Sequence, residues 1–416
     1  MSISDNDNSI LRSLAEKIAA IAALPIHKEK TKLWTKLNDL KKTRPLVWIN
    51  EICWHEMNVN DELTLRCKNK LARMAENQMR MQLYQWEHLP ADMVIEPIFY
   101  AQTFINDSGF GITLDEETII QAQGDISSHD YKPVITKESD IEKIKTPILS
   151  LDTEKNEQYL TMLNEAFGDV LEIKPDGIPM SWFSPWDQLV QWWGVQESMM
   201  DLVMRPEMIH AAMDRLTDAY LARLRQWKKL NVLSFHNGNY RVGSGGLGCT
   251  SELPGSDYDP ARVLPHNQWG CAVAQIFGSV SPDMHEEFGL KYERRWTENF
   301  GLVYYGCCEP LHDKFEILKK NMPNLRKLSC SPWCDIEKLC GQAQNNYVVS
   351  VKPNPAIFAR DTWNINEAED ELRSSLEKSQ GCNVEIIAKD LSTMRGEPQR
   401  LWEWTDMAVS ICSEYN

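Results

Sequence analysis

Hydrophobic residues recur at helical spacing near the start of the chain. The spacing predicts helices over residues 8–24 and 28–41, and we expect residues 1–43 to form a helical N-terminal extension. The stretch RPLVWINEI, residues 44–52, is short and rich in β-branched residues, with Pro45 at one end. It therefore predicts the first strand of a second unit, which we expect to span residues 44–416.

Short apolar strands alternate with amphipathic helices in the second half of the chain. The runs are continuously apolar, which is typical of strands whose two faces are covered, and the alternation implies parallel pairing through right-handed crossovers. No G-x-G-x-x-G motif follows the first strand, so a dinucleotide-binding fold has little support. We predict an α/β fold of the (β/α)8 TIM type. Its later strands are expected at 231–238, 271–280, 301–307, 325–331, 347–353 and 383–391.

Residues 106–150 interrupt the alternation of strands and helices. They are polar and contain Gly109, Gly111, Gly124 and Pro133, residues that end regular elements. We expect an insertion of short strands here.

Composition and charge exclude several classes of protein. Apolar residues make up 43% and charged residues 25%, as in a globular protein, and the net charge of −16 argues against a nucleic-acid groove. No apolar run is long enough to span a membrane, so no membrane partner is expected. The polar, acidic N-terminus lacks the features of a secretory signal, and eleven scattered cysteines indicate thiols in a reducing cytoplasm.

The expected strand ends carry reactive side chains. In a barrel of this type the active site is built at the C-terminal ends of the strands. We therefore take Tyr305, Glu309, Lys389 and Asp390 as candidate catalytic residues. Candidate substrate-binding residues at the same positions are His236, Asn237, Asn239, Gln275 and Lys352.

Fifteen tryptophans are a high number for this length, and several are close in sequence, including Trp182 and Trp186. They indicate either packing between strands and helices or an aromatic wall around a flat ligand. On the second interpretation Trp186 joins the candidate substrate-binding residues.

The segment YYGCCEPLH, residues 304–312, places two thiols and a carboxylate before a helix. Cys307, Cys308 and Glu309 are therefore candidate zinc ligands. Because neighbouring strand residues point to opposite faces, only one of the two cysteines is expected to face the barrel mouth.

The loop HNGNYRVGSGGLG, residues 236–248, is rich in glycine. Such a loop brings backbone N–H groups to an anionic ligand, or it forms a long ordered turn. It lacks the Lys-Ser/Thr pair of a phosphate loop. His285 lies in HEEFG, which is not a zinc-protease motif, so we expect a packing or capping role.

The chain resembles the uroporphyrinogen decarboxylase-like superfamily over roughly residues 44–413, and a subgroup from anaerobic bacteria in particular. The resemblance rests on WHEM at 54–57, NGNYRVGSGG at 237–246, ELP at 252–254, YYGCCEPL at 304–311, SPW at 331–333, VKPNP at 351–355 and RLWEW at 400–404. It implies a barrel and methyl transfer in corrinoid-linked demethylation.

Zinc methyltransferases of this superfamily use a His-x-Cys pair and a later cysteine. The matching positions here are Tyr305, Cys307 and Lys389, so one ligand of three is present and zinc would need Glu309, Cys308 or His236. The arginine-rich motif of true uroporphyrinogen decarboxylases has no equivalent.

We expect a methyltransferase that moves a methyl group from a small methylated substrate, such as an aryl methyl ether, to a corrinoid protein. The leaving group needs a proton or a Lewis acid, which Tyr305, Lys389, Asp390 or a metal at Cys307 could supply. The alternatives are a zinc-dependent thiol methyltransferase of the coenzyme M or homocysteine type, a tetrapyrrole decarboxylase, and a non-catalytic corrinoid or tetrapyrrole binder.

Overall fold

The structure is a computed structural model that describes residues 3–114, 116–119 and 128–415. Its α-helices are α1 (Asp5–Ala22), α2 (Ile26–Asn38), α3 (Lys70–His88), α4 (Thr153–Phe167), α5 (Pro185–Trp193), α6 (Val195–Met204), α7 (Pro206–Leu230), α8 (Pro282–His285), α9 (Lys291–Thr297), α10 (Phe315–Asn321), α11 (Ile336–Ala343), α12 (Ile365–Lys378) and α13 (Gln399–Glu414).

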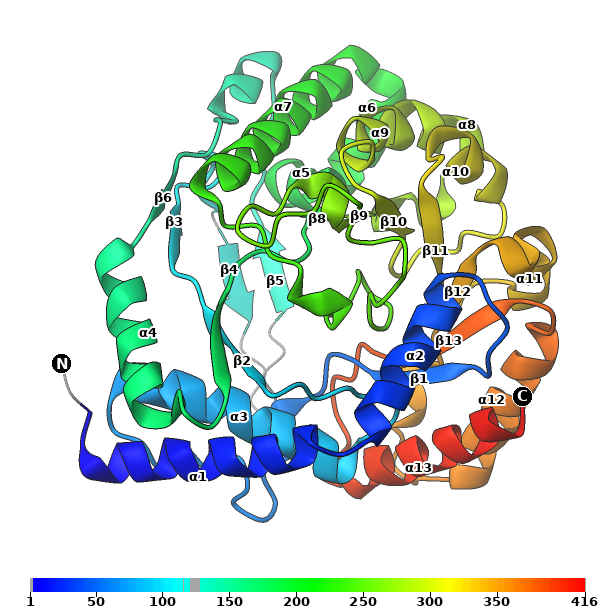
Figure 1. Cartoon of the computed structure of the whole chain (residues 1–416). Helices are drawn as coiled ribbons and strands as arrows, with labels where there is room; N and C mark the ends of the chain where they lie inside the picture. The colour runs from blue at the N-terminus through cyan, green and yellow to red at the C-terminus, as the bar shows by residue number, and fades with distance from the viewer. Residues whose placement is uncertain (1–2, 115, 120–127, 416) are drawn as a thin grey trace.

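The strands are β1 (Leu46–Ile49), β2 (Ile98–Gln102), β3 (Ile105–Asp107), β4 (Glu116–Ile119), β5 (Ser128–Tyr131), β6 (Leu149–Leu151), β7 (Glu172–Asp176), β8 (Trp182–Phe183), β9 (Trp269–Ala272), β10 (Leu302–Tyr305), β11 (Leu325–Cys330), β12 (Val348–Val351) and β13 (Asn383–Ala388). Seven of them form a parallel sheet in the order β1-β13-β12-β11-β10-β9-β8. Figure 1 shows this sheet as an arc with helices α7 to α13 around its outer side.

The predicted α/β class with parallel strands is confirmed, whereas the closed barrel is not. Strands β2 and β7 form a separate parallel pair, and no ring of hydrogen bonds joins this pair to the seven-stranded sheet among the described residues. The segment that runs from β7 to β8 explains why there are two separate sheets. Residues 172–176 pair with β2, but residues 182–183 pair with β9, so one segment leaves the first sheet and enters the second.

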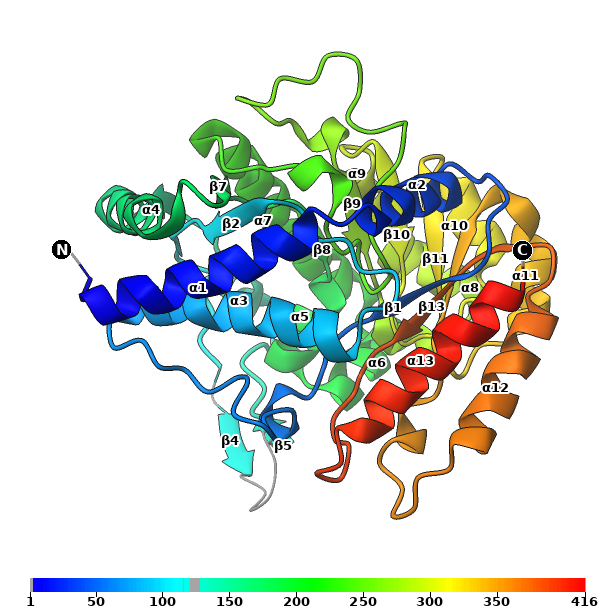
Figure 2. The same ribbon diagram turned by 60° about the horizontal axis from the view of Figure 1, so that its bottom comes forward.

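The predicted insertion of short strands is confirmed in its described parts. Strands β3 and β6 pair antiparallel, and so do β4 and β5. Gly124 lies outside the described residues. In Figure 2 the β4–β5 hairpin projects from the lower edge of the molecule, whereas α2 lies towards the top.

A glycine-rich hairpin, residues 240–248, covers the inner face of the large sheet. Its two arms pair through Val242 N–H to Gly246 O at 3.0 Å and Gly248 N–H to Tyr240 O at 3.0 Å. A Cβ atom on Gly245 would lie 2.4 Å from the Glu385 carboxylate, so this close approach requires glycine. Strands β9, β10, β12 and β13 are buried along their whole length, because helices cover one face and the hairpin the other.

The hairpin is held by a buried ion pair inside the sheet. Lys327 Nζ lies 2.9 Å from Glu385 Oε2, and both side chains are fully buried. Gly246 N–H donates to Glu385 Oε1 at 3.1 Å, and Ser350 Oγ donates to the same oxygen at 2.6 Å. The carboxylate that this glycine loop binds therefore belongs to the protein, and the loop forms an ordered turn.

Helices α1 and α2 occupy the expected N-terminal region. Trp34 of α2 is buried with Leu46 and Val348, the first residues of β1 and β12, so α2 covers the N-terminal ends of these strands. Asn38 Nδ2 donates to Leu247 O at 2.9 Å and ties α2 to the hairpin. The domain boundary at residue 43 remains a prediction. None of the helices in the described part of the chain is long and apolar enough to cross a membrane.

Candidate functional site

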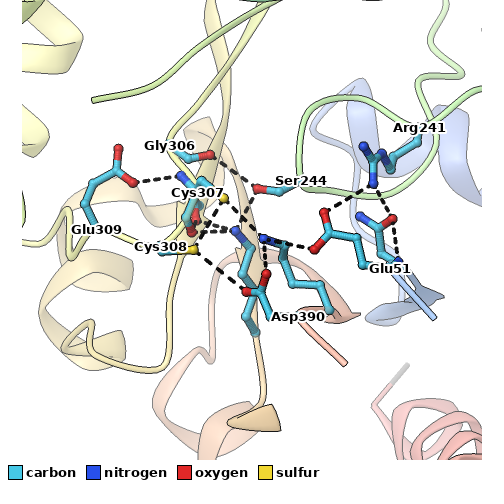
Figure 3. Close-up of polar contacts among 12 residues, drawn as sticks. Glu51, Arg241, Ser244, Gly306, Cys307, Cys308, Glu309 and Asp390 are labelled. Carbon is cyan, nitrogen blue, oxygen red and sulfur yellow. Dashed lines mark hydrogen bonds and ion pairs between the residues drawn. The ribbon is translucent and has the colours of Figure 1, made fainter. Parts of the chain in front are cut away.

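Four strands of the large sheet bring reactive side chains to one of its edges. Cys307 follows β10, Lys352 follows β12, Lys389 follows β13 and Glu51 follows β1. Because these strands are parallel, their C-terminal ends lie together, as the sequence predicted. Figure 3 shows the polar contacts that connect this group.

The sulfur of Cys307 lies at the centre of the cluster. Its Sγ atom is 3.2 Å from Lys389 Nζ and 3.5 Å from Cys308 Sγ. The hydrogen bond from Cys308, together with the charges of Lys352 and Lys389, outweighs burial and lowers the pKa of Cys307 to about 5. These contacts favour the thiolate, which is the nucleophilic form of the Cys307 side chain.

Cys308 is the protonated partner of this thiolate. Donation of its S–H to Cys307, together with burial, raises the pKa of Cys308, and its Sγ atom also lies 3.8 Å from Asp390 Oδ2. The expectation that only one cysteine faces the mouth is wrong. Strand β10 ends at Tyr305, and Gly306 has a φ of 91°, so the chain turns before the pair and the strand alternation no longer applies.

Lys352 holds the cysteine loop in place. Its Nζ atom donates to Ser244 Oγ at 2.7 Å, Ser329 Oγ at 2.6 Å and Cys307 O at 2.7 Å. Burial lowers the pKa of Lys352, whose side chain is only 4% exposed. These three contacts use all the donors of an ammonium group. The predicted substrate-binding role is therefore replaced by a positioning role.

Lys389 belongs to a row of alternating charges. Its Nζ atom lies 2.9 Å from Asp390 Oδ1 and 3.5 Å from Glu51 Oε2, and Arg241 of the hairpin contacts Glu51 at 3.5 Å. Burial opposes the charged form, but the Cys307 thiolate and Asp390 outweigh it and raise the pKa of Lys389. Glu51 and Asp390 have φ values of 50° and 57°, a strained conformation that is common at functional sites.

A small cavity of about 330 Å³ opens beside the cysteine pair. Gln275, predicted as a substrate-binding residue, lies in its wall. Asp187 of α5 faces it too, and burial, with a contribution from the Cys307 charge, raises the pKa of this carboxyl although Gln275 donates a hydrogen bond to it. The cavity is lined by Asp187, Val190, Gln275, Ile276, Gly278, Cys308, Glu309 and Pro310.

Glu309 is buried, and one oxygen of its carboxylate is turned to the backbone of Cys307 (Figure 3). Its Oε2 atom accepts a hydrogen bond from Cys307 N–H at 2.9 Å, and Oε1 has no hydrogen-bond partner among the described residues. Burial raises the pKa of Glu309 to about 7, despite the hydrogen bond. We therefore assign Glu309 to the support of the Cys307 loop.

The predicted zinc ligands do not fit a metal ion. The Glu309 carboxylate already accepts the hydrogen bond of Cys307 N–H, and the ammonium group of Lys389 already contacts Cys307 Sγ. Over the residues that the structure describes, no three His, Cys, Asp or Glu side chains converge as metal ligands. We assign no chemical step to a metal here, and zinc binding stays an untested prediction.

Two of the predicted residues face the helical layer and not the cluster. Tyr305 is fully buried, and its hydroxyl lies 2.7 Å from His285 Nε2, so His285 has the expected packing role. Trp186 is fully buried and donates to Phe288 O at 2.8 Å. This favours the packing interpretation of the tryptophans over the aromatic wall.

His236, Asn237 and Asn239 lie in a separate group. The His236 ring lies against Tyr100 in a tilted arrangement at a centroid distance of 3.9 Å, and both asparagines donate to the carboxylate of Glu96, at 2.8 and 3.1 Å. His236 and Asn237 line a second cavity of about 640 Å³, and none of its lining residues belongs to the cysteine cluster. The structure does not bring these three residues to Cys307.

Sequence reasoning missed Asp187, Ser244, Arg241 and Glu51. Ser244 and Arg241 lie in the glycine-rich segment that the sequence singled out, but its return into the sheet has no local signal. Glu51 follows the first predicted strand and could have been found by the same strand-end argument.

Neither the protein-family models nor the curated proteins contain a match to the chain. Among solved structures, the chain is similar to a methyltransferase from Methanosarcina mazei, with a TM-score of 0.51 and 10% sequence identity. The match covers 93% of this chain and 98% of that chain. At this identity the likeness establishes that the two proteins share a fold over nearly their whole length.

Proposed function

We propose that this protein is a methyltransferase that removes the methyl group of a small methylated compound, such as an aryl methyl ether. One observation carries the proposal: Cys307 and the ammonium group of Lys389 meet next to Cys308, and Cys308 and Asp187 line a cavity of about 330 Å³ at the C-terminal edge of the sheet. The shared fold with a protein described as a methyltransferase supports it.

Cleavage of a methyl ether needs groups that protonate the leaving oxygen or stabilise its negative charge. As the methyl–oxygen bond breaks, negative charge develops on that oxygen, and a proton donor or a nearby cation lowers the barrier. Asp187 lies at the cavity, and burial raises its pKa towards the protonated form. We assign proton donation to Asp187 and charge stabilisation to Lys389, whose own pKa is raised.

We propose a corrinoid protein as the partner that accepts the methyl group. Its cofactor would supply the nucleophile, which the chain itself need not provide. A partner has to reach the C-terminal edge of the sheet. Trp333 lies three residues beyond the end of β11 and is 71% exposed, and such a side chain suits a contact surface.

The two alternative activities have less support. A zinc-dependent thiol methyltransferase needs a set of metal ligands, which the cysteine cluster does not provide. A tetrapyrrole decarboxylase has to bind several carboxylates of its substrate. Lys389 alone would be too few cations for this, since Arg241 contacts Glu51 and Lys352 is fully hydrogen-bonded.

The proposal is tested by incubating the protein with a reduced corrinoid protein and a panel of methoxylated aromatic compounds. We expect formation of methylcobalamin, followed by absorbance, together with an equal amount of the phenol. Asp187→Asn and Lys389→Met should lower the rate by about a hundredfold or more, as expected for loss of an acid or a charge in the transition state.

Lys338→Met is the matched control, because Lys338 also forms an ion pair with an aspartate but lies on α11, away from the cavity. It should leave the rate unchanged. Failure to form methylcobalamin from any compound of a broad panel would overturn the proposal.

A further inference from the structure

The cysteine pair has a chemistry of its own that does not depend on the proposed methyl transfer. Cys307 Sγ and Cys308 Sγ lie 3.5 Å apart, and both side chains are partly exposed. Cys308 lines the cavity of about 330 Å³, which gives a small reagent access to the pair. We propose that Cys307 and Cys308 are a reversible modification site, which a hydroperoxide converts to a disulfide between the two neighbouring residues.

Cys307 is the sulfur that reacts first. Its Sγ atom lies 3.2 Å from the ammonium group of Lys389 and 3.5 Å from Cys308 Sγ, and a thiolate at Cys307 can accept a hydrogen bond from both. Thiolates attack peroxides, whereas protonated thiols are nearly inert. Cys308 keeps its proton in the resting state and is therefore the resolving residue.

The reaction balances in two steps. In the first, the Cys307 thiolate attacks the peroxide, a sulfur–oxygen bond forms, the oxygen–oxygen bond breaks, and the leaving alkoxide or hydroxide takes up a proton. Cys307 is thereby oxidised by two electrons to a sulfenic acid. In the second step Cys308, having given up its proton, attacks that sulfur, the sulfur–sulfur bond forms, and water leaves. The sum is two thiols and one hydroperoxide giving one disulfide, one alcohol or water, and one further water.

Asp390 is close enough to Cys308 to take up its proton in the second step. Its Oδ2 atom lies 3.8 Å from Cys308 Sγ, and a carboxylate at this position can accept the proton that Cys308 loses. The cysteines lie beyond the end of β10, so the backbone of Cys307 is held by side-chain contacts from Lys352 and Glu309 and not by the strand ladder.

The disulfide should be easy to reduce. Neighbouring Cα atoms are about 3.8 Å apart, which is shorter than the usual separation in disulfides of about 4.4 to 6.8 Å. A disulfide closed across such a short span is strained, and strained disulfides are reduced readily by thiols. The modification is therefore reversible and returns the thiolate to Lys389.

The experiment treats the reduced full-length protein with one equivalent of hydrogen peroxide and maps its cysteines by mass spectrometry. The tryptic peptide of residues 296–314 contains Cys307 and Cys308 as its two cysteines, and the peptide of residues 328–338 contains the buried pair Cys330 and Cys334. We expect the first peptide to lose two hydrogen atoms and to regain them with dithiothreitol. The second peptide, an internal control, should stay reduced.

Two variants define the order of the steps. Cys308→Ser should stop at the sulfenic acid, which dimedone traps on Cys307, and Cys307→Ser should react at least about tenfold more slowly, because its remaining thiol is protonated. The proposal is wrong if peptide 296–314 stays reduced while other cysteines oxidise, if either cysteine bridges to a distant one, or if Cys307→Ser reacts as fast as the wild type. Each of these results leaves the methyltransferase proposal untouched, which separates the two tests.

Discussion

Replacing Lys389 by methionine removes the ammonium group that lies 3.2 Å from Cys307 Sγ while keeping a side chain of similar length. Coulomb's law gives on the order of 5 kcal/mol for two unit charges at this distance with an effective dielectric constant of about 20, which is an upper bound. Cys308 and Lys352 still favour the thiolate in the variant. A single opposite charge at this range usually shifts a pKa by about 1 to 3 units. We therefore expect the pKa of Cys307 to rise from about 5 to roughly 6 to 8.

The assay is the rate of alkylation of Cys307 by iodoacetamide as a function of pH, measured on the peptide of residues 296–314 with fragment ions that distinguish the two cysteines. For a shift of two units, the rate at pH 6 should fall by roughly tenfold, while the rates at pH 9 should agree. Lys389→Arg keeps the charge and should keep the wild-type profile. An unchanged midpoint in Lys389→Met would refute the assignment of Lys389 as a partner of the thiolate.

Three further predictions test the packing and electrostatics around the cluster. A Cβ atom on Gly246 would lie 2.2 Å from the Trp34 ring, so Gly246→Ala should destabilise the protein by about 1 to 3 kcal/mol in urea unfolding. The control is Gly341→Ala, where the added atom meets nothing within 4 Å, and it should be neutral or stabilising. Equal unfolding midpoints for the two variants would contradict the close packing of the hairpin against Trp34. Glu293 of α9 is fully buried, and burial raises its pKa from 4.5 to about 8. Between these two pH values the folded state keeps a proton that the unfolded state releases. The free energy of unfolding should therefore fall by up to about 1.4 kcal/mol per pH unit as the pH rises from 4.5 to about 8. Glu293→Gln should flatten that slope, and a slope identical to the wild type counts against a neutral buried carboxyl. Metal analysis of the purified protein should find no zinc that depends on Cys307, because the ligand set is incomplete; one zinc per chain that Cys307→Ser abolishes would overturn this.

The convergence of the site could be predicted because it depends on local patterns. Continuous apolar runs identify parallel strands, and the residues that follow such strands lie at one edge of the sheet. Cys307, Lys352 and Lys389 were found in this way, and Glu51 could have been. Closure of the barrel has no such local pattern, because alternation of strands and helices indicates parallel pairing but not how the first and last strands meet.

The direction of each side chain could not be predicted from the sequence. Tyr304 and Tyr305 are neighbours on β10 and point to opposite faces. Tyr304 contacts Ser244 of the hairpin, whereas Tyr305 contacts His285 in the helical layer, and the sequence YY does not indicate which face is which. A tyrosine chosen for catalysis was therefore placed on the wrong side of the sheet.

Contacts between segments far apart in the sequence could not be predicted either. The glycine-rich segment was recognised as a special loop, but the carboxylate that it binds is Glu385, 139 residues from Gly246. In the same way, residues 231–238 were expected to form a strand, but Leu233 makes an isolated bridge there, His236 begins a short 3-10 helix, and its ring lies at Tyr100 and the second cavity. These placements depend on how the sheet curves and on what fills its inner face.

The position of a bound substrate tests the central claim most directly. The two cavities compete for this role, one beside Cys308 and Asp187, the other beside His236. A crystal structure of the protein soaked with a methoxylated aromatic compound should show the methoxy oxygen within hydrogen-bonding distance of Asp187 or Lys389. The same compound bound only against His236 and Tyr100, with the cavity beside Cys308 free, would contradict the assignment of the site.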